Sequence, residues 1–256
     1  QIPDLYKKIF EASISVATPN KIAASSVYDN YLSLKQLARK HNVEFLFETN
    51  VGAGLPVIST MRNLIHSGDR IIKIEAVLSG SVSFIFNNFD GTKPFSQLVN
   101  EAKELGYTEP DPRDDLSGAD VKRKITILAR EAGYAVNTDE VSINPILPDN
   151  CMQASSVDAF FTALKQEDAY FNEMLIKARQ VGGSLRFIAK AENGKVSCGV
   201  ETVTTDSPFY NLGGSDNMIV FTTQRYKQRP LVVRGPGAGA EVTAAGIFAE
   251  IISAGS

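Results

Sequence analysis

The segment at residues 106–124 holds the side chains best suited to chemistry, and it reads GYTEPDPRDDLSGADVKRK. Asp120 and Lys124 stand four residues apart, so a helix would display both on one face. Carboxylates can bind an ammonium group of a ligand, and a lysine can give a proton to a reacting oxygen. The segment is therefore a candidate substrate site. Its acids are Glu109, Asp111, Asp114, Asp115 and Asp120.

The same spacing is also typical of an ordinary surface ion pair, which stabilises a helix by about 0.2–0.5 kcal/mol. The other acids would then form a solvated turn beside a helix N-terminus. Spacing alone favours this interpretation, because most exposed pairs of this kind have no further role. Other parts of the sequence are needed to distinguish a substrate site from a surface ion pair.

Local signals predict how this segment folds. Pro110 and Pro112 fix φ and disfavour helical backbone in the residues before them, so we expect a stiff, extended loop at residues 107–114. Ser117 followed by Asp120 predicts an N-cap with an acid at the third helical position. The helix that follows carries an apolar stripe at helical spacing, formed by Val121, Ile125, Leu128 and Ala132.

Two further turns join a predicted strand to a predicted helix. Lys21 follows a strand at residues 14–18 and precedes a helix expected at residues 23–41, and this end of a strand is where open α/β sheets bind ligands. Residues 48–56 follow a strand at 43–47 and are rich in glycine, so their carbonyls and Glu48 can hold a hard cation. The alternatives are a surface lysine and a tight strand–helix turn.

The remaining pattern predicts an α/β protein. Residues 141–150 should be a loop, and Glu192-Asn193-Gly194 is a hairpin turn signal. We expect strands at residues 70–78, 184–191, 196–203, 218–223 and 230–233, and helices at 57–66, 82–89, 95–105, 157–164, 168–180 and 242–253.

Gly235, Gly237 and Ala240 match the dinucleotide-binding pattern G-x-G-x-x-G/A between a strand and a helix. After Ala240 the sequence has 256 − 240 = 16 residues, which cannot hold the second strand with its ribose-binding acid. Pro236 also removes one N–H that a phosphate would need. We therefore expect a glycine loop that permits a close approach to the backbone, and not the start of a Rossmann half.

Composition excludes several classes of function. The 256 residues are 43% hydrophobic, which suits one sizeable domain or two small ones. A net charge of −3 without a long basic run argues against a nucleic-acid or membrane-surface partner. No apolar run reaches about 18 residues and no secretory leader opens the chain, so we expect no membrane segment. Cys151 and Cys198 are expected to be reduced, buried thiols of a cytoplasmic protein.

The two histidines, His41 and His66, have no cysteine or histidine neighbour at metal-ligand spacing. Both lie near predicted helix ends, where a solvated cation is the simpler interpretation for His41. Histidine-based acid–base chemistry and zinc chemistry are therefore not expected. Proton transfer would have to come from lysine, tyrosine, aspartate or glutamate.

Five motifs, in this order along nearly the whole chain, resemble homoserine dehydrogenase, and most of all the dehydrogenase part of bifunctional aspartokinase–homoserine dehydrogenases. The resemblance implies NAD(P)-dependent interconversion of L-homoserine and L-aspartate 4-semialdehyde, in threonine and methionine biosynthesis. The motifs are TPNK at residues 18–21, ETNVGAGLP at 48–56, SGSVSFIF at 79–86, the whole segment at 106–124, and RGPGAGAEVTAAG at 234–246.

The resemblance also implies roles for single residues. Lys124 matches the proton donor, and Lys21 matches a second lysine near the reacting oxygen and the nicotinamide. Glu109 and Asp120 match the acids that hold the amino group and the hydroxyl side of homoserine, and Gly239 matches a backbone contact to the cofactor. Further substrate-binding residues would be Gly106, Tyr107, Asp115 and Ser81, where relatives often carry threonine. A monovalent cation, sodium in the family, would be held by Glu48, Val51, Ala53 and Leu55.

This chemistry agrees with the residues. Hydride addition to an aldehyde leaves an oxygen that must be protonated, and a lysine whose pKa is lowered by a second cation can supply that proton. Lys21 would provide the second cation beside Lys124. Asp120, one helical turn before Lys124, would oppose the lowering of its pKa. We therefore expect Asp120 to orient the reacting groups.

The resemblance implies a division of the chain into three parts: residues 1–40 as the C-terminal part of a nucleotide-binding domain, 41–230 as a substrate-binding and dimerisation domain, and 231–256 as a return segment. The expected fold is a partial Rossmann-type remnant with an open mixed sheet, covered by helices on one face. Such a sheet commonly pairs with a second subunit, so we expect a homodimer. An aspartokinase domain would lie upstream.

Two functional hypotheses remain. The chain is either the catalytic part of a homoserine dehydrogenase, or a substrate-binding and dimerisation fragment that does not turn over by itself. The second follows because most of the N-terminal nucleotide-binding half is expected to be missing, and with it the residues that distinguish NADP from NAD. A third, weaker hypothesis is another α/β oxidoreductase with a lysine acid.

Overall fold

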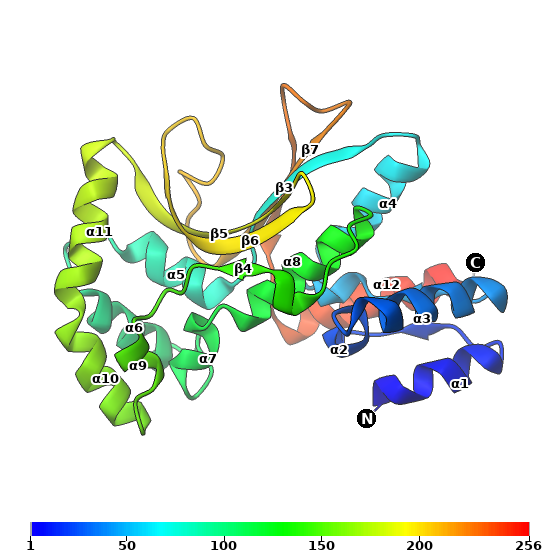
Figure 1. The fold of residues 1–256 in the computed structure, drawn as a ribbon, viewed down its shortest axis with the longest axis horizontal. Helices are drawn as coiled ribbons and strands as arrows, with labels where there is room; N and C mark the ends of the chain where they lie inside the picture. Colours follow the sequence, from blue (N-terminus) through cyan, green and yellow to red (C-terminus); the bar gives the residue numbers. More distant parts are fainter. Residues whose placement is uncertain (1, 256) are drawn as a thin grey trace.

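A six-stranded sheet runs through the middle of the protein, in the strand order β4-β6-β5-β3-β7-β8 (Figure 1). The computed structural model describes residues 2–255. β4 runs parallel to β6 and the other four neighbouring pairs are antiparallel, so the sheet is mixed, as predicted. The strands are β3 (Ile71–Val77), β4 (Ser142–Ile143), β5 (Ser184–Glu192), β6 (Lys195–Val203), β7 (Asp216–Thr223) and β8 (Leu231–Pro236).

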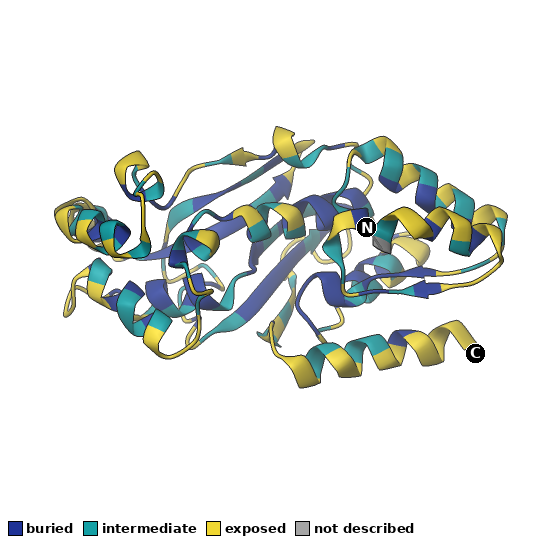
Figure 2. Cartoon of the chain, turned by 90° about the horizontal axis from the view of Figure 1, so that it is seen from below, coloured by how far each residue is buried: buried dark blue, intermediate teal, exposed yellow. Residues whose placement is uncertain are grey.

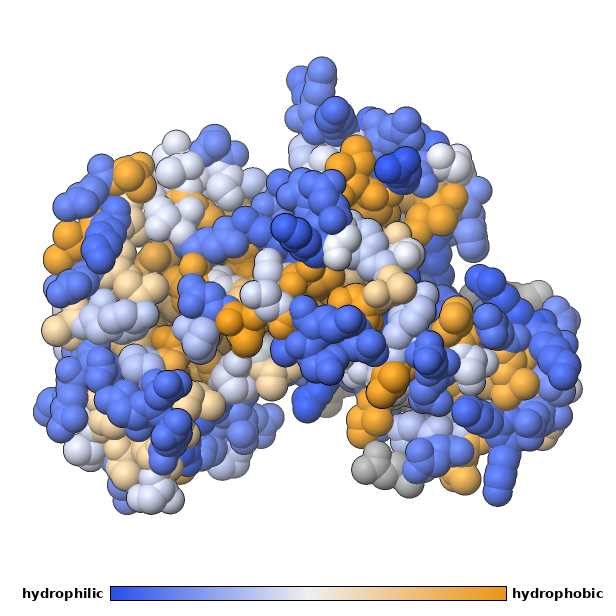
Figure 3. All heavy atoms as spheres, in the orientation of Figure 1, coloured by the Kyte–Doolittle hydropathy of each residue, from blue (hydrophilic) through white to orange (hydrophobic). Residues whose placement is uncertain are grey.

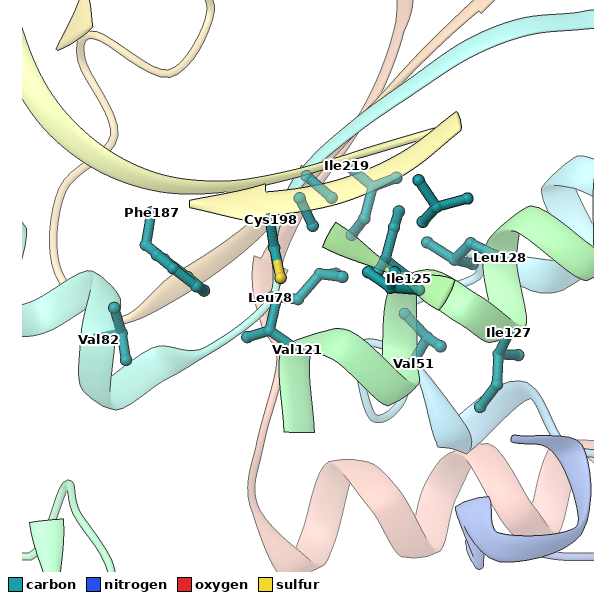
Figure 4. Close-up of a cluster of buried hydrophobic side chains, with 14 of the residues drawn as sticks. Val51, Leu78, Val82, Val121, Ile125, Ile127, Leu128, Phe187, Cys198 and Ile219 are labelled. Carbon is teal, nitrogen blue, oxygen red and sulfur yellow. The ribbon is translucent and has the colours of Figure 1, made fainter. Parts of the chain in front are cut away.

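Helices cover one face of this sheet, which lies above them in Figure 1. Phe187 and Ala189 of β5 point into the main core on the helical side, and Ile188 between them points to the other side. Figure 4 shows Val121 and Ile125 beneath the sheet. The helices are α5 (Gly80–Asn88), α6 (Phe95–Glu104), α7 (Pro112–Leu116), α8 (Ala119–Glu131), α9 (Asp149–Met152), α10 (Val157–Gln166) and α11 (Asp168–Gln180).

The opposite face of the sheet is covered at one end by the loop between β6 and β7. Phe209 and Leu212 of that loop form a second, smaller hydrophobic cluster with the strands. Beside this loop the face carries charged side chains instead of a second layer of helices. Ion pairs there join Glu75 with Lys73 and Lys190, and Lys190 with Glu201.

The N-terminal elements and the C-terminal helix form a second group, blue and red at the right of Figure 1. β1 (Val16–Ala17) pairs in parallel with β2 (Phe45–Leu46). α12 (Ala240–Gly255) packs on β1 and on η2 (Glu48–Asn50), and Figure 2 shows much of its surface exposed. This packing agrees with a return segment, while the domain boundaries stay a prediction. The other elements are η1 (Ile2–Leu5), α1 (Tyr6–Glu11), α2 (Lys21–Ala24), α3 (Tyr28–Lys40), α4 (Ile58–His66) and η3 (Thr138–Glu140).

Helix α8 lies at the junction of the two groups. Val121, Ile125 and Leu128 of its predicted apolar stripe are buried, and Ala132, at the C-cap, is half-buried. Residues 125–130 are moreover buried on every side of the helix. The additional burial comes from α2 and α4, which pack against α8 as the sheet does. Ile127 accordingly projects away from the sheet in Figure 4. The one-sided amphipathic pattern in the sequence therefore underestimated how much of the surface of this helix is buried.

Two predictions about the central segment were wrong. The extended loop stops at Asp111, because Pro112 occupies the first turn of α7, where proline is favourable, and the Asp111 carboxylate accepts a hydrogen bond from the Arg113 N–H. The N-cap of α8 is Gly118, whose φ is +71°, and not Ser117. The Ser117 hydroxyl still accepts a hydrogen bond from the Ala119 N–H, at 3.2 Å.

Two other predicted elements are divided differently. The helix expected at residues 23–41 is two helices, α2 and α3, with a break at residues 25–27. The break persists because side chains from distant parts of the chain bind its backbone groups. Residues 141–150, expected to be a loop, contain the short edge strand β4 and the first residues of α9, since β4 finds a partner in β6.

Two smaller predictions are confirmed, the hairpin turn and the two buried, unpaired cysteines. Asn193 and Gly194 turn the chain between β5 and β6 with positive φ values. Cys151 and Cys198 are buried and unpaired, and burial raises the pKa of each thiol to about 11. Within residues 2–255 no helix is long and apolar enough to cross a membrane. The same residues contain no cluster of three or more histidine, cysteine or acidic side chains suited to a metal ion.

Candidate active site

A cavity of about 850 Å³ lies where the two groups of elements meet. Figure 3 shows the surface hollowed between the lobe with α7 and the lobe with α2. Residues far apart in the sequence line it, from Pro19 to Ile247. Of the predicted site residues, those that line the cavity are Lys21, Ala53, Glu109, Asp115, Asp120, Lys124 and Gly239.

Two lysines share one carboxylate in this cavity. Lys124 Nζ lies 2.8 Å from Asp120 Oδ2, and Lys21 Nζ lies 3.5 Å from Asp120 Oδ1. Lys124 also donates to the Leu78 carbonyl at 2.8 Å, and its side chain is 12% exposed. An ammonium group has three N–H donors, so one donor of Lys124 remains for a ligand. The sequence spacing predicted the pair within α8, and the fold adds Lys21.

The carboxylate of Asp120 is held in its ionised form. Burial by itself would raise its pKa, but the charges of Lys124 and Lys21, and their hydrogen bonds, outweigh burial and lower the pKa below its ordinary value. Asp120 therefore stays negative at neutral pH and fixes two ammonium groups on one side of the cavity. The role of Asp120 in orienting the reacting groups stays a prediction.

Asp115 organises the loop that precedes α8. Its Oδ1 accepts a hydrogen bond from the Ser81 hydroxyl at 2.7 Å, and its Oδ2 accepts one from the Glu109 N–H at 2.8 Å. Both oxygens of this carboxylate thus have partners in the protein. Glu109 itself is exposed and lines the cavity with a free path to a ligand. The structure brings these three predicted residues together.

Gly106 and Tyr107 lie farther from the cavity. Tyr107 is 44% exposed and stacks on the ring of Phe84, with ring centroids 4.5 Å apart. Gly106 ends α6 with a φ of +74°. Neither residue is among those that line the cavity. Their predicted contact with a substrate stays a prediction.

The predicted cation group is only partly free. The Glu48 carboxylate accepts hydrogen bonds from the N–H groups of Val57, Ile58 and Ser59, so it caps α4. The Leu55 carbonyl accepts from the Val57 N–H at 2.9 Å. Within the described residues no N–H donates to the carbonyls of Val51 and Ala53. Two free carbonyls fit a hard cation, whereas the carboxylate is already occupied.

The glycine turn before α12 packs against a buried amide. β8, which precedes this turn, is an antiparallel partner of β7, so the turn does not open a Rossmann half, as predicted. A side chain at Gly237 would overlap the amide group of Asn217. Asn217 is 1% exposed, and neither polar atom of its amide has a hydrogen-bond partner among the described residues. The close approach predicted for this turn is therefore made, at least in part, by Asn217.

We expect Gly237→Ala to destabilise the protein by about 1–3 kcal/mol, because the added methyl group overpacks this turn. Urea unfolding would measure the change. Gly213→Ala is the matched control, since nothing lies within 4 Å of a side chain there. The double variant Gly237→Ala/Asn217→Ala should recover much of the loss. Equal stability of Gly237→Ala and Gly213→Ala would contradict the prediction.

Sequence reasoning did not assign several polar residues that line the cavity. Arg123 was detectable, because it follows Asp120 by three residues on the same helix. Asp114 and Ser117 were detectable as well, because they belong to the segment at residues 106–124. The remaining residues carry no local signal, since turns that are distant in sequence bring them to the cavity. Unassigned polar lining residues are Thr49, Asn50, Ser79, Asp114, Ser117, Arg123 and Thr243.

Comparison with known proteins finds a matching family. The family model of homoserine dehydrogenase matches residues 56–252. The chain is 46% identical over 249 residues to a bifunctional aspartokinase/homoserine dehydrogenase 2 of Zea mays, covering 96% of this chain and 27% of that protein. It is 43% identical over 259 residues to the homoserine dehydrogenase of Schizosaccharomyces pombe, covering 98% of this chain and 69% of that one.

A solved structure has the same fold. It is a hyperthermophilic archaeal homoserine dehydrogenase in complex with NADPH, with a TM-score of 0.74 and 27% identity. The match covers 99% of this chain and 68% of the archaeal chain. The chain thus has the mixed α/β fold of an oxidoreductase family. The chain belongs to the homoserine dehydrogenase family. It spans about a quarter of the length of the bifunctional relatives it matches.

Proposed function

We propose that this chain is the substrate-binding and catalytic part of an enzyme that interconverts L-homoserine and L-aspartate 4-semialdehyde with NAD(P), in threonine and methionine biosynthesis. The observation that carries the proposal is the pair of ammonium groups on Asp120, inside a cavity that also holds Glu109 and the turn at Gly239. Family membership supports the same reaction.

Each group has a role that its surroundings allow. Lys124 gives a proton to the carbonyl oxygen of the semialdehyde as reduction proceeds, and takes one from the hydroxyl in the reverse direction. Asp120 orients Lys124 and Lys21. Glu109 binds the ammonium group of the substrate, because its carboxylate faces the cavity. Asp115 and Ser81 hold the loop that presents Glu109.

We propose a cofactor site and a cation site at the residues that the sequence analysis assigned to each. When bound, a nicotinamide cofactor supplies or accepts the hydride, and Lys21 with the backbone at Gly239 would hold its reacting end. The archaeal relative was solved with NADPH. The free carbonyls of Val51 and Ala53 would supply ligands to a sodium ion, while Glu48 and Leu55, whose oxygens already accept hydrogen bonds, would hold the turn that presents them.

Turnover is tested by the oxidation of NADPH in the presence of L-aspartate 4-semialdehyde. The proposal expects consumption of NADPH that depends on the semialdehyde. The alternative, a binding and dimerisation fragment, expects no turnover by the 256-residue chain and full turnover by a longer chain that adds an N-terminal nucleotide-binding half. No turnover by either chain would contradict the assigned reaction.

Three further features belong to the proposal. We place residues 1–40 and 231–256 with a nucleotide-binding domain, because α12 packs on β1. We propose a cytoplasmic location, supported by two buried free thiols. We also propose an aspartokinase domain upstream, since the Zea mays relative is a bifunctional aspartokinase/homoserine dehydrogenase.

The uncovered part of the sheet is proposed as a homodimer interface. Val232 of β8 is 43% exposed on this face, beside the cavity lined by Ile72 and Val220. We expect sedimentation to give a dimer, and Val232→Lys to weaken the dimer at least about tenfold, because a charge is then buried between subunits. Ile176→Lys, on α11, is the matched control at 47% exposure. A dimer equally stable in both variants would exclude this face.

A further inference from the structure

The break between α2 and α3 is bound by side chains more than a hundred residues later in the chain. Arg130 donates from Nη1 to the Ala24 carbonyl at 2.8 Å and from Nη2 to the Ser26 carbonyl at 2.6 Å. The Thr138 hydroxyl donates to the carbonyl of Ser25 at 3.0 Å. Three successive carbonyls that α2 leaves without helical partners are thus all satisfied.

The other side of the break is held as well. The Asn137 side-chain oxygen accepts a hydrogen bond from the N–H of Tyr28, the first residue of α3, at 2.8 Å. The three residues Arg130, Asn137 and Thr138 therefore fix both helix ends at the break. We call these three residues the clamp.

Two of the three nitrogens of the Arg130 guanidinium bind this break. Arg130 is 4% exposed, its Nε donates to the Val136 carbonyl at 3.0 Å, and the rings of Tyr28 and Tyr31 lie against its guanidinium. Among the described residues no carboxylate lies within ion-pair distance of it. A buried cation without a counter-ion is costly, so its hydrogen bonds to carbonyls and the two rings have to offset that cost.

The clamp connects the two sides of the candidate active site. Lys21 is the first residue of α2, a helix of four residues whose far end Arg130 holds. Asp120 and Lys124 lie on α8, the helix that carries Arg130. One helix thus presents Asp120 and Lys124 to the cavity and, two turns further on, grips the short helix that presents Lys21.

We propose that Arg130, with Asn137 and Thr138, is a positioning residue that sets Lys21 against Asp120 and Lys124. The effect of the clamp on turnover rests on the proposed function, whereas its effect on the position of Lys21 does not. Its direct consequence is geometric: without the clamp, α2 shifts and Lys21 leaves Asp120. A displacement of about 1 Å in such a group is enough to lower a rate strongly.

The first test measures the reactivity of Lys21 and does not need turnover. Reductive methylation of the folded protein, quantified by mass spectrometry for each lysine, compares the wild type with Arg130→Lys. Lysine keeps the charge but cannot reach three carbonyls at once. We expect Lys21 to react at least about threefold faster in Arg130→Lys, with Lys122 unchanged as an internal reference.

Arg186 offers a matched control. It is 6% exposed and, like Arg130, binds backbone carbonyls, but it holds the loop that contains Phe209 and Leu212. Arg186→Lys should lower the Tm to a comparable extent and leave the reactivity of Lys21 unchanged. Equal Lys21 reactivity in the wild type, Arg130→Lys and Arg186→Lys would overturn the clamp.

Thr138→Val keeps the test decisive if Arg130→Lys does not fold, since it removes one hydrogen bond and keeps the side-chain volume. Lys21 should still react measurably faster in Thr138→Val, and an unchanged rate would count against the clamp. In a chain that turns over, kcat should fall at least tenfold more in Arg130→Lys than in Arg186→Lys. Absence of turnover in the wild type would oppose the proposed function and leave the labelling result to decide the clamp.

Discussion

Replacing Lys124 by alanine should lower kcat and kcat/KM by about 100- to 10,000-fold, the usual contribution of a positioned proton donor. The side chain is only 12% exposed and keeps one N–H free for a ligand, so truncation removes the proposed proton donor from the cavity. Steady-state kinetics with semialdehyde and NADPH, in a chain that turns over, would measure the loss. Kinetics like those of the wild type would contradict the assignment of Lys124.

Two companion variants separate proton transfer from binding. Lys124→Arg keeps the positive charge beside Asp120, but a guanidinium does not give up its proton at neutral pH. This variant should bind substrate and still have a low kcat. Lys122→Ala, on the same helix but outside the cavity, should keep its activity. Recovery of kcat in Lys124→Arg would show that the charge alone is what matters.

Replacing Glu131 by glutamine should lower the free energy of unfolding by about 3–5 kcal/mol, because two partly buried cations lose the buried carboxylate that they share. The Glu131 side chain is 3% exposed, and its carboxylate binds Lys35 at 2.7 Å and Arg62 at 3.2 Å. Tyr31 donates to it as well. The carboxylate thus joins α3, α4 and α8. Urea unfolding at neutral pH would measure the loss.

The effect of Glu131 depends on pH in a definite direction. Burial alone would raise its pKa, but Lys35 and Arg62 outweigh burial and lower the pKa below the ordinary value. A carboxyl whose pKa is lowered on folding stabilises the protein above the pKa of the unfolded chain, about 4.3. The stability difference between the wild type and Glu131→Gln should therefore be full at pH 7 and shrink as the pH falls below about 4.

Glu101→Gln is the control for Glu131→Gln. Glu101 pairs with Lys93 on the surface of α6, where solvent screens the charges, so its loss should matter far less. Equal destabilisation by the two substitutions would mean that burial of Glu131 adds nothing to its effect.

The elements of the fold were largely predictable, because strand and helix periodicity is local. The hairpin at Asn193 and Gly194 is one case, since the turn needs positive φ values that these residues adopt readily. The break at residues 25–27 was not predictable, because its backbone partners are Arg130, Asn137 and Thr138. The residues of the break itself read as helix.

In the candidate site, too, contacts within one element were predictable from the sequence, and contacts between distant elements were not. Asp120 and Lys124 were found from their spacing within one helix. The contact of Lys21 with Asp120 joins residues about a hundred positions apart, so only the resemblance to a family suggested it. The capping role of Glu48 also depends on a turn that brings three N–H groups of α4 to its carboxylate.

The packing of α12 on the N-terminal elements has a consequence for the order of folding. The Glu48 N–H donates to the Glu250 carboxylate, a contact that spans 202 positions of sequence. Contacts of such long range form late, because the chain entropy lost in closing a large loop has to be repaid first. The lobe around β1 emerges from the ribosome before α12 does, yet it gains these contacts only after residues 240–255 are made. Nascent chains that stop short of α12 should therefore expose this lobe to chaperones.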